Sequence, residues 1–558
     1  MTGKKADCQL SAVCAAVYII LIWNLIPVVY GIIDDRSMME ILSGQYLGVP
    51  DPHAIFLGFW YSLALAGLYQ GVPEIDWYAL SYLFWQGVCI WMILYRILRK
   101  EQEEPQRTLS VCVCLLAFTV FALPSLTQLT FTTTATVLGS TLLFWYMTTE
   151  QISVVDVGVL AVLGFLTCQI RYSIFLMILP VCAVLWLFRI AKKDQRNRWN
   201  LLMPVVVAGI FFIDITGDWA GYGSPEWRDY QEYNKYRSAV YDYADYTFPI
   251  YEGAESFYQC VGIEKKSRAR TLINYNYTAD DQIQPEFFRE YIKEYQKAFP
   301  PQESRWERIR RSIKEYGTGI IKGRFHLQHK IALILYALLC IWHVRRRSWY
   351  GCMKAADAAG IQMLLWIYLI YEGRIPERVI YSMNLMFMTV AFFLWLEVLR
   401  EQKRCLRLAG KQILCLILCV LSVVQITRIR QQNMETYHRN KSVEELKEYC
   451  MEHSENFYFN DVTSLAFTTS NVQLWREEPY WMNYMSLGDW MSFSPVWKEK
   501  LEQHQIEHVK EALYEQEHIY LICSFDKGLE YLALLYENVV CTELDKVAGF
   551  GIYRLQSL

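Results

Sequence analysis

The sequence lacks several features that would assign it to a common functional class. Its 54 Lys and Arg residues nearly balance its 57 Asp and Glu residues, and the net charge of −3 argues against nucleic acid as a partner. Although it has 16 cysteines, no CxxC pair or Cys/His spacing indicates a zinc site. It also lacks internal repeats, low-complexity tracts and a small-residue cleavage site after its first apolar run, which we therefore interpret as a signal anchor.

What the sequence has in abundance is apolar residues. Hydrophobic residues make up 54% of the chain, aromatic residues 15% and charged residues 20%, with a mean hydropathy of +0.12. These values suit a mainly α-helical, multi-pass membrane protein with sizeable water-exposed domains. Apolar runs of roughly 16–23 residues, each long enough to span a bilayer, lie near residues 11–33, 54–69, 77–95, 109–126, 131–148, 154–170, 172–190, 200–216, 328–344, 355–371, 379–399 and 411–427.

Basic residues in the short loops predict the topology, because cytoplasmic loops carry an excess of Lys and Arg. Lys4 and Lys5 place the N-terminus in the cytoplasm. Four later loops agree with one another if every run from 77 to 427 crosses once, but they agree with the N-terminus only if the run 54–69 does not cross. The basic residues of these loops are Arg96, Arg99, Lys100 and Arg107; Lys192, Lys193, Arg196 and Arg198; Arg345, Arg346 and Arg347; and Arg400, Lys403, Arg404, Arg407 and Lys411.

We therefore expect eleven spans, with residues 54–69 forming a re-entrant or interfacial helix. The alternative is that 54–69 spans and one basic loop breaks the rule. The chain then divides into four parts: a membrane module (1–216) whose first external loop is 34–76, an external helical or irregular domain (217–328), further spans (329–427) and an external domain (428–558). In the last part, a basic connector and a helix (Val443 to His453) lead to the strand-like runs NFYFN and HIYLICSF, and a helical stretch from Leu529 to Glu537 and a last strand, GFGIYRL, follow. This alternation of strands and helices predicts a small α/β domain on the extracytoplasmic side.

Under this topology, carboxylates and arginines gather on the external side near span ends. Asp34 and Asp35 follow the first span, and Arg171 lies in a tight hairpin at membrane depth, where an unpaired charge is costly and a functional role is expected. A carboxylate can deprotonate an acceptor or hold a metal, and arginines suit phosphate oxygens. The other candidates on this side are Asp51, His53, Gln128, Arg237, Asp242, Arg374 and Arg378.

Each candidate also has an ordinary structural interpretation. An acidic pair at a helix end is often a solvated cap. Arg374 and Arg378 could anchor a helix at the interface or pair with Glu372 and Glu377, and Arg171 could belong to a buried ion pair. The set as a whole predicts group transfer from a lipid-linked phosphate donor more strongly than any single member does.

A first span, an external loop opening with an acidic pair, an interfacial helix, further spans and an outer C-terminal domain resemble the GT-C superfamily of integral membrane glycosyltransferases. The stretches PDPHAIFLGFWYSLALAGLY, PEIDWY, TQLTFTTTA, YNKYRSAVYDYADYTFPIY and YEGRIPERV resemble a bacterial variant of it. The resemblance implies a polyprenyl-phosphate sugar donor, hexosyl transfer on the outer side and Asp34 or Asp35 as the base.

By the same resemblance, Arg171, Arg374 and Arg378 would bind the donor phosphate. Asp51, His53, Gln128, Arg237 and Asp242 would line the site. The sequence departs from the superfamily at Thr127-Gln128-Leu129-Thr130, where some members carry an Asp-x-Asp/Glu metal motif. A divalent metal is therefore possible but not predicted, and the oligosaccharyltransferase branch is disfavoured.

The sequence thus predicts a glycosyltransferase, inverting or retaining, that moves a sugar from a polyprenyl-phosphate donor to an extracytoplasmic glycan, polymer or lipid acceptor in the cell membrane. Two alternatives stay open. A transporter or flippase for a lipid-linked sugar would need polar residues spread through the bilayer mid-plane, and an inactive scaffold of envelope assembly would keep the acidic pair only as a cap.

Overall fold

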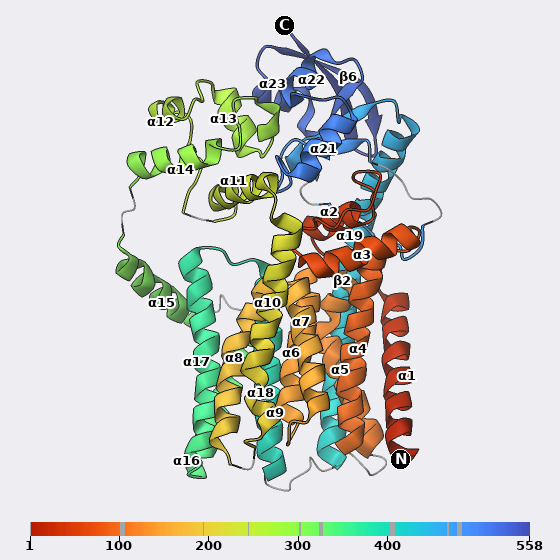
Figure 1. Cartoon of the computed structure of the whole chain (residues 1–558), viewed down its shortest axis with the longest axis vertical. Coiled ribbons are helices and arrows are strands. Elements are labelled where there is room, and N and C mark those ends of the chain that lie inside the picture. The colour runs from red at the N-terminus through yellow and green to blue at the C-terminus, as the bar shows by residue number, and fades with distance from the viewer. Residues whose placement is uncertain are drawn as a thin grey trace.

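The computed structural model describes residues 2–100, 106–193, 195–243, 245–300, 303–322, 327–401, 408–465, 468–476 and 482–558. Figure 1 shows an elongated molecule with a bundle of long helices at one end and smaller domains at the other. The N-terminus lies at the free end of the bundle, and the C-terminus lies at the far tip of the domains. We call the end of the bundle that meets these domains the domain end.

Within the described residues, nine helices are long and apolar enough to cross a membrane, and they correspond to nine of the eleven predicted spans. The protein is therefore a multi-pass membrane protein. These helices are α1 (Thr2–Leu25), α4 (Trp77–Lys100), α5 (Gln106–Thr127), α8 (Tyr172–Ala191), α10 (Met203–Tyr222, preceded by the one-turn α9, Arg198–Leu201), α16 (Leu327–Arg345), α17 (Trp349–Glu372), α18 (Glu377–Glu401) and α19 (Leu408–Glu452).

The other two predicted spans are α6 (Phe131–Thr148) and α7 (Val154–Ile170). The shorter α7 has 17 residues, and nearly every residue of the Thr-rich α6 is buried. Both lie among the longer helices of the bundle (Figure 1). Several threonines of α6 satisfy their hydroxyls along the helix, as Thr136 does by donating to the Thr132 carbonyl at 2.8 Å, whereas the buried Thr132 hydroxyl has no hydrogen-bond partner among the described residues.

The first span ends earlier than the sequence suggests. We expected the apolar run to continue to residue 33, but α1 ends at Leu25, two residues before Pro27, which cannot continue a helix. A short strand, β1 (Val29–Tyr30), comes next and pairs in parallel with β2 (Gln128–Leu129). Asp34 therefore does not terminate a span, because it lies in the first turn of a separate helix, α2 (Ile33–Leu42).

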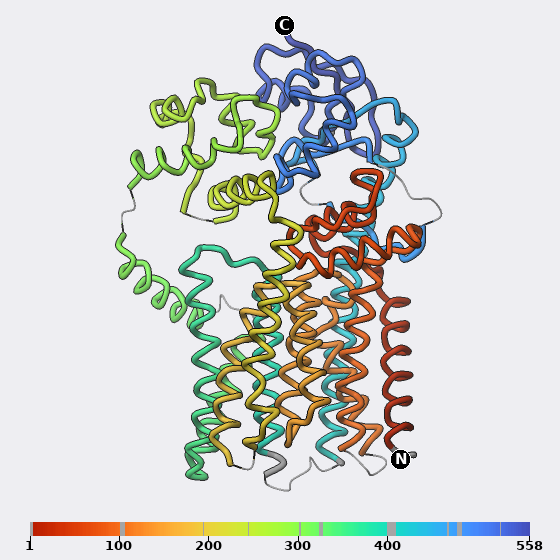
Figure 2. Tube along the Cα trace, viewed as in Figure 1, coloured from red at the N-terminus to blue at the C-terminus, as the bar shows by residue number. Residues whose placement is uncertain are grey.

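The run 54–69 does not cross the bundle. Its helix, α3 (Phe59–Gly71), has 13 residues and is roughly 20 Å long at 1.5 Å per residue, whereas a hydrocarbon core is about 30 Å thick. Figure 2 shows α3 lying across the domain end of the bundle beside α2. The structure thus confirms the expectation that residues 54–69 form a short helix that does not cross the bundle.

Between spans α10 and α16 the chain forms a set of short helices at the domain end. These are α11 (Pro225–Tyr241), α12 (Glu255–Cys260), α13 (Lys266–Ile273), η1 (Tyr277–Ala279), α14 (Phe287–Ala298) and α15 (Arg305–Ile321). Aromatic residues hold the first five together: the Tyr241 ring stacks on Tyr275 at 4.0 Å and lies 5.6 Å from Phe288 of α14. In contrast, α15 lies against the outside of the bundle (Figure 1).

The last span continues directly into the C-terminal domain. We expected a basic connector and a separate helix over 443–453, but α19 is one helix of 45 residues that carries the chain out of the bundle. The reason is local, because no Pro or Gly lies between residues 411 and 452 to interrupt it. The predicted basic loop residues Lys403, Arg404 and Arg407 lie within residues 402–407, which are outside the described residues.

The C-terminal domain is the small α/β domain that the sequence predicts. Its sheet has the order β4-β3-β5-β7-β6, with β3 parallel to β4 and β5, and β7 antiparallel to β5 and β6. The predicted strands are β3 (Phe457–Asn460), β5 (Ile519–Ser524) and β7 (Phe550–Ser557), and the predicted helix is α23 (Gly528–Leu535). The sequence did not indicate β4 (Tyr484–Ser486) or β6 (Val539–Val547). The remaining elements are α20 (Val462–Leu465), α21 (Pro495–Gln503), α22 (Val509–Glu515) and η2 (Phe525–Lys527).

This domain is joined to both ends of the first external loop. Tyr30 donates its backbone N–H to the Ser470 carbonyl at 2.9 Å, and Asp76 donates to the Leu474 carbonyl at 3.2 Å. Isolated bridges pair Val29 with Asn471 and Ile75 with Trp475. The segment 470–476 thus pairs with the strand before α2 and with the residues before α4, so it fixes the loop that carries Asp34.

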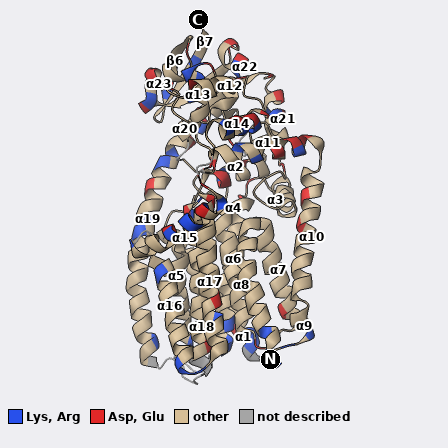
Figure 3. Cartoon of the chain, turned by 90° about the vertical axis from the view of Figure 1, so that its left-hand side faces the viewer, with Lys and Arg blue, Asp and Glu red and all other residues tan. Residues whose placement is uncertain are grey.

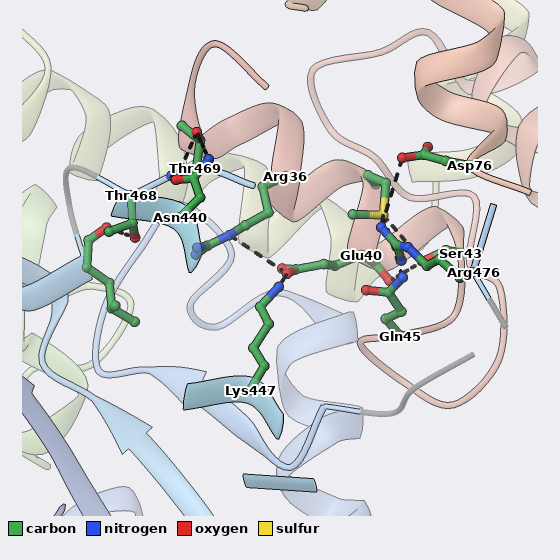
Figure 4. Close-up of polar contacts among 12 residues, drawn as sticks. Arg36, Glu40, Ser43, Gln45, Asp76, Asn440, Lys447, Thr468, Thr469 and Arg476 are labelled. Carbon is green, nitrogen blue, oxygen red and sulfur yellow. Dashed lines mark hydrogen bonds and ion pairs between the residues drawn. The ribbon is translucent and has the colours of Figure 1, made fainter. Parts of the chain in front are cut away.

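A buried ion network strengthens this connection (Figure 4). Lys447 of α19 donates to Glu40 of α2 at 2.9 Å, and Arg36 lies 3.7 Å from the same carboxylate. Burial alone would raise the pKa of Glu40, but the charges of Lys447 and Arg36 outweigh it, so the pKa lies below its ordinary value. Removing one of these side chains would leave the charge of another buried without its partner, which is strongly destabilising. The ion network therefore holds α2 against α19.

Candidate functional site

The two adjacent carboxylates of α2 point in different directions. Successive residues of an α-helix are rotated by about 100°, so Asp34 and Asp35 cannot face the same neighbours. Asp35 is fully buried, whereas the Asp34 side chain keeps 18% of its exposure. Their position in the first turn of α2 favours negative charge through the helix dipole.

Asp35 fastens α2 to two spans. Its Oδ1 accepts hydrogen bonds from the Tyr78 hydroxyl of α4 at 2.7 Å and from the Phe131 backbone N–H at the start of α6 at 2.9 Å. Its Oδ2 is buried and accepts no hydrogen bond from any residue that the structure describes. Burial raises the pKa of Asp35 to about 8, against the lowering effect of Tyr78 and Phe131. At neutral pH this carboxyl is therefore mainly protonated.

Asp34 faces a group of arginines from other parts of the chain. Its Oδ2 lies 3.4 Å from Nη2 of Arg378, in the first turn of α18. Burial raises the pKa of Asp34, while Arg378, Arg171 and Arg374 act in the opposite direction. The side chains of Arg378 and Arg374 retain 23% and 33% of their exposure, so a ligand can reach the charges.

Arg171 reaches the same region from the turn between α7 and α8, of which it is the only linking residue. Its guanidinium carbon lies 4.7 Å from the centroid of the Phe131 ring and 5.6 Å from that of Phe56. Burial lowers the pKa of Arg171 to about 10, with the charge of Arg378 acting in the same direction and Asp34 in the opposite one. An arginine at this pKa keeps its charge at neutral pH, and the aromatic rings hold its planar group in place.

The end of α11 supplies the other side of this group. Asp242 accepts a hydrogen bond from Ser238 at 2.7 Å and lies 3.6 Å from Arg237 and 3.8 Å from Arg374. Arg374 also lies over the Tyr243 ring, with its guanidinium carbon 5.0 Å from the centroid. Asp242 thus links the loop before α18 to α11, and its charge acts on Asp34.

The charges of this site do not cancel. Four guanidinium groups, on Arg171, Arg237, Arg374 and Arg378, lie near the carboxyl groups of Asp34 and Asp242, while Asp35 is mainly protonated. A third carboxyl, that of Asp489, also lies near Arg237, and burial raises its pKa. Even with Asp34, Asp242 and Asp489 all charged, the arginines leave an excess of positive charge in this partly buried space. Such an excess favours a phosphate group, which guanidinium groups bind through parallel hydrogen bonds.

Three of the predicted residues lie outside this group. Gln128 turns toward α19, where its amide donates to Asn433 at 2.8 Å. His53 donates to Asp51 at 2.8 Å, and its other ring nitrogen lies 3.1 Å from the Gly221 carbonyl. The His53 ring also stacks on Trp227 at 4.7 Å. Asp51 and His53 therefore connect the loop between α2 and α3 to the junction of α10 and α11.

The donor set of this site suits an anion better than a cation. Within the described part of the chain, no group of three or more His, Cys, Asp or Glu side chains is placed to hold a metal ion. Asp34 is the partly exposed carboxylate of this site, and its ion-pair partner is Arg378. The positive charge of Arg378 would repel a divalent cation. The motif Thr127-Gln128-Leu129-Thr130 adds no carboxylate.

Sequence reasoning did not identify the residues that organise the acidic pair. Tyr78 and Phe131 lie in apolar runs and look like ordinary core residues, yet both contact Asp35. Phe131 also lies beneath Arg171, so one residue orients both a carboxyl and an arginine. The sequence carries no signal for either role, since only the packing of α2 against α4 and α6 creates them.

Comparisons with known proteins give a structural match but no match in sequence. No protein-family model matches the sequence, and no curated protein matches it. Among solved structures, the crystal structure of ArnT from Cupriavidus metallidurans bound to undecaprenyl phosphate matches 98% of this chain and 97% of that chain, at 10% sequence identity and a TM-score of 0.40. A likeness at this level says nothing about the site, whose chemistry depends on the residues of this chain alone.

Proposed function

We propose that this protein is a membrane glycosyltransferase that moves a sugar from a polyprenyl-phosphate donor to a hydroxyl or amine acceptor. The observation that carries the proposal is the meeting of Asp34 with Arg171, Arg374 and Arg378 at the domain end of an apolar bundle. This site suits a phosphate with a long apolar tail, because its charged groups lie at the ends of the membrane spans, where the phosphate can bind the arginines while the tail stays in the membrane.

In this proposal Asp34 is the base. Its carboxylate takes the proton of the acceptor hydroxyl as the acceptor oxygen forms a bond to the anomeric carbon of the sugar. The bond between that carbon and the phosphate oxygen breaks, and the electron pair stays on the phosphate. Arg171, Arg374 and Arg378 stabilise the charge that develops there. The excess positive charge of the site stabilises the second negative charge that the departing phosphate gains.

Asp35 has a different role in the same proposal. Its carboxyl is fully buried and mainly protonated at neutral pH, and its Oδ1 already accepts hydrogen bonds from Tyr78 and Phe131, so it is not available to an acceptor. It therefore holds α2 in the orientation that turns Asp34 toward the arginines. Two carboxylates whose environments separate their pKa values can take separate roles in one site.

The proposed orientation places the site outside the cytoplasm. Basic residues gather at the end of the bundle that carries the N-terminus (Figure 3), among them Arg99 and Lys100 at the end of α4 and Arg345 at the end of α16. The positive-inside rule assigns this end to the cytoplasm. The domain end then faces outward, where the C-terminal domain, fixed to the first external loop, is placed to bind a glycan or lipid acceptor.

The test is sugar transfer by purified protein in lipid nanodiscs. Radiolabelled sugars on synthetic polyprenyl phosphates are supplied as donors, and donor consumption is measured with and without envelope extracts as acceptors. Asp34→Asn is expected to lower turnover by about 10²- to 10⁴-fold, the usual contribution of a general base, whereas Asp35→Asn keeps most of it. Glu377→Gln is the matched control, because Glu377 is exposed and adjacent to Arg378.

Other outcomes would point to other functions. Donor binding that requires Arg378, without turnover and without an effect of Asp34→Asn, would refute the enzyme and favour a transporter of lipid-linked sugars. No binding of any donor would refute the phosphate site itself and leave a scaffold of envelope assembly as the better explanation.

A further inference from the structure

Among the described elements between α10 and α16, α15 alone packs along the bundle rather than with the domains (Figures 1 and 3). Its inward face contains Ser312, Tyr316 and Gly319, which are buried. Arg308 fixes the position of α15 along the bundle axis. Its Nε donates to the backbone carbonyl of Tyr371 at 2.8 Å, and Tyr371 is one residue before the end of α17. The helix therefore begins where the spans leave the bundle.

The other end of α15 lies beside the start of α16. The Tyr316 hydroxyl is 3.3 Å from Nε2 of His329, in the first turn of that span. Between Arg308 and Tyr316, α15 thus follows the margin of the bundle at the level of the span ends. This is the depth of lipid headgroups if α16 and α17 cross the membrane, as their length and composition indicate.

The outward face of α15 carries large apolar side chains that the protein does not cover. Trp306 is 79% exposed, Ile313 52% and Ile321 86%. Their spacing of seven and eight residues places them on one side of the helix. Trp is typical of the membrane interface, where one part of its ring system meets apolar chains and its N–H meets water.

Positive charges accompany this apolar stripe. Arg305, Arg310 and Lys314 are exposed, and none of them forms an ion pair with a residue that the structure describes, whereas Arg308 and Arg311 pair with Asp245 and Glu303. Arg310 and Lys314 are four residues apart, so their side chains are neighbours on the helix surface. Arg310 itself lies between Trp306 and Ile313 along the apolar stripe.

We propose that α15 is an interfacial helix that binds the phosphate groups of anionic phospholipids. Arg310 and Lys314 contact the headgroup phosphates, and Trp306, Ile313 and Ile321 enter the region below them. Charge complementarity selects the occupant, because the free charges of this face are cationic while the apolar stripe requires acyl chains. The inference is independent of the glycosyltransferase proposal, since α15 contributes no residue to the site of Asp34.

The experiment uses native mass spectrometry of the full-length purified protein. Phosphatidylglycerol and phosphatidylcholine are titrated separately, and bound lipids are counted. The variant Arg310→Gln/Lys314→Gln removes both charges from α15. The matched control, Arg289→Gln/Lys293→Gln, removes two exposed charges with the same spacing from α14, which lies away from the bundle.

The α15 variant is expected to bind phosphatidylglycerol about fivefold more weakly or worse and to bind phosphatidylcholine as the natural sequence does. In the natural sequence, the preference for phosphatidylglycerol over phosphatidylcholine should decrease as salt is added, and in the variant this salt dependence should be lost. The control should behave as the natural sequence does. Equal binding of both lipids by the natural sequence, or equal loss of both in the variant, would overturn headgroup recognition. So would a loss confined to undecaprenyl phosphate in a competition titration, because α15 would then serve the donor.

A second measurement tests the depth of the helix. Phospholipids brominated on the upper part of their acyl chains quench tryptophan fluorescence at short range, and Trp306→Phe removes one fluorophore from α15. The quenchable part of the emission should fall in this variant by comparison with the natural sequence. An unchanged quenchable part would place Trp306 in water and refute the proposal.

Discussion

Replacing Asp35 by Asn should change how the stability of the protein depends on pH. The pKa of Asp35 is about 8, against an ordinary value of 3.8, because the group is buried. Between these values the folded protein binds a proton that the unfolded chain releases, so stability is highest below the ordinary pKa and falls as pH rises to about 8. Asn stays neutral throughout this range and removes the dependence.

The magnitude comes from the size of the shift. One pKa unit corresponds to about 1.4 kcal/mol, so between pH 5 and pH 8 the natural protein should lose about 4 kcal/mol relative to Asp35→Asn. An unfolding entropy of about 2.1 cal/mol/K per residue converts this loss to about 3 °C in Tm for a chain of this length. In Asp35→Asn, the side-chain oxygen can still accept hydrogen bonds from Tyr78 and Phe131. Any free-energy cost of burying the new amide group is the same at every pH, so it does not change how stability depends on pH.

The assay is thermal unfolding in detergent, followed by tryptophan fluorescence at half-unit steps from pH 5 to pH 8.5. The difference in Tm between Asp35→Asn and the natural sequence should grow steadily with pH and level off near pH 8. Glu377→Gln serves as the control for the loss of one carboxylate at the same end of the bundle. A constant difference for Asp35→Asn would refute the raised pKa and the reasoning about burial.

The same contacts predict three further results. Tyr78→Phe removes a hydrogen bond that lowers the pKa of Asp35, so the levelling of the same stability curve should move to a higher pH; an unchanged curve would show that Tyr78 does not act on Asp35. Arg378→Gln should reduce donor turnover by about 10²- to 10³-fold through lost charge stabilisation, with Arg289→Gln as the control in the same transfer assay. EDTA should leave turnover unchanged, because the open carboxylate of Asp34 lies beside Arg378 rather than beside further oxygen ligands; a loss that Mg²⁺ or Mn²⁺ restores would contradict this.

The course of the chain could be predicted from the sequence because its signals are local. Apolar length defined the spans, and the balance of basic loops excluded residues 54–69 from crossing, which α3 confirms with its 13 residues. Boundaries were less certain. The hydrophobicity of the residues after Leu25 suggested a longer first span, although this run contains Pro27. The polar residues of α19 beyond the bundle suggested a connector and a separate helix, whereas the structure has one continuous helix.

The candidate site could be predicted only as a list of polar residues on one side. Asp34, Arg171, Arg374, Arg378 and Asp242 come from four separate parts of the chain, and the structure brings them together. Gln128 shares their side of the bundle, yet its partner is Asn433 on α19, more than 300 residues away in sequence. No pattern of spacing distinguishes these two cases, because both depend on how α2, α18 and α19 pack at the domain end.

The different roles of Asp34 and Asp35 also arise from a property that the sequence contains only implicitly. Adjacent residues look equivalent when the chain is expected to leave the membrane as a loop. Once residues 33–42 form a helix, a rotation of about 100° per residue separates the two carboxylates. One meets Tyr78 and the N-terminus of α6, where burial keeps it protonated, and the other meets Arg378 in a partly exposed space, where it can be charged. A buried, protonated carboxyl beside one that faces arginines is therefore a consequence of helix geometry, and a substitution that unwinds the first turn of α2 should erase the difference between Asp34→Asn and Asp35→Asn.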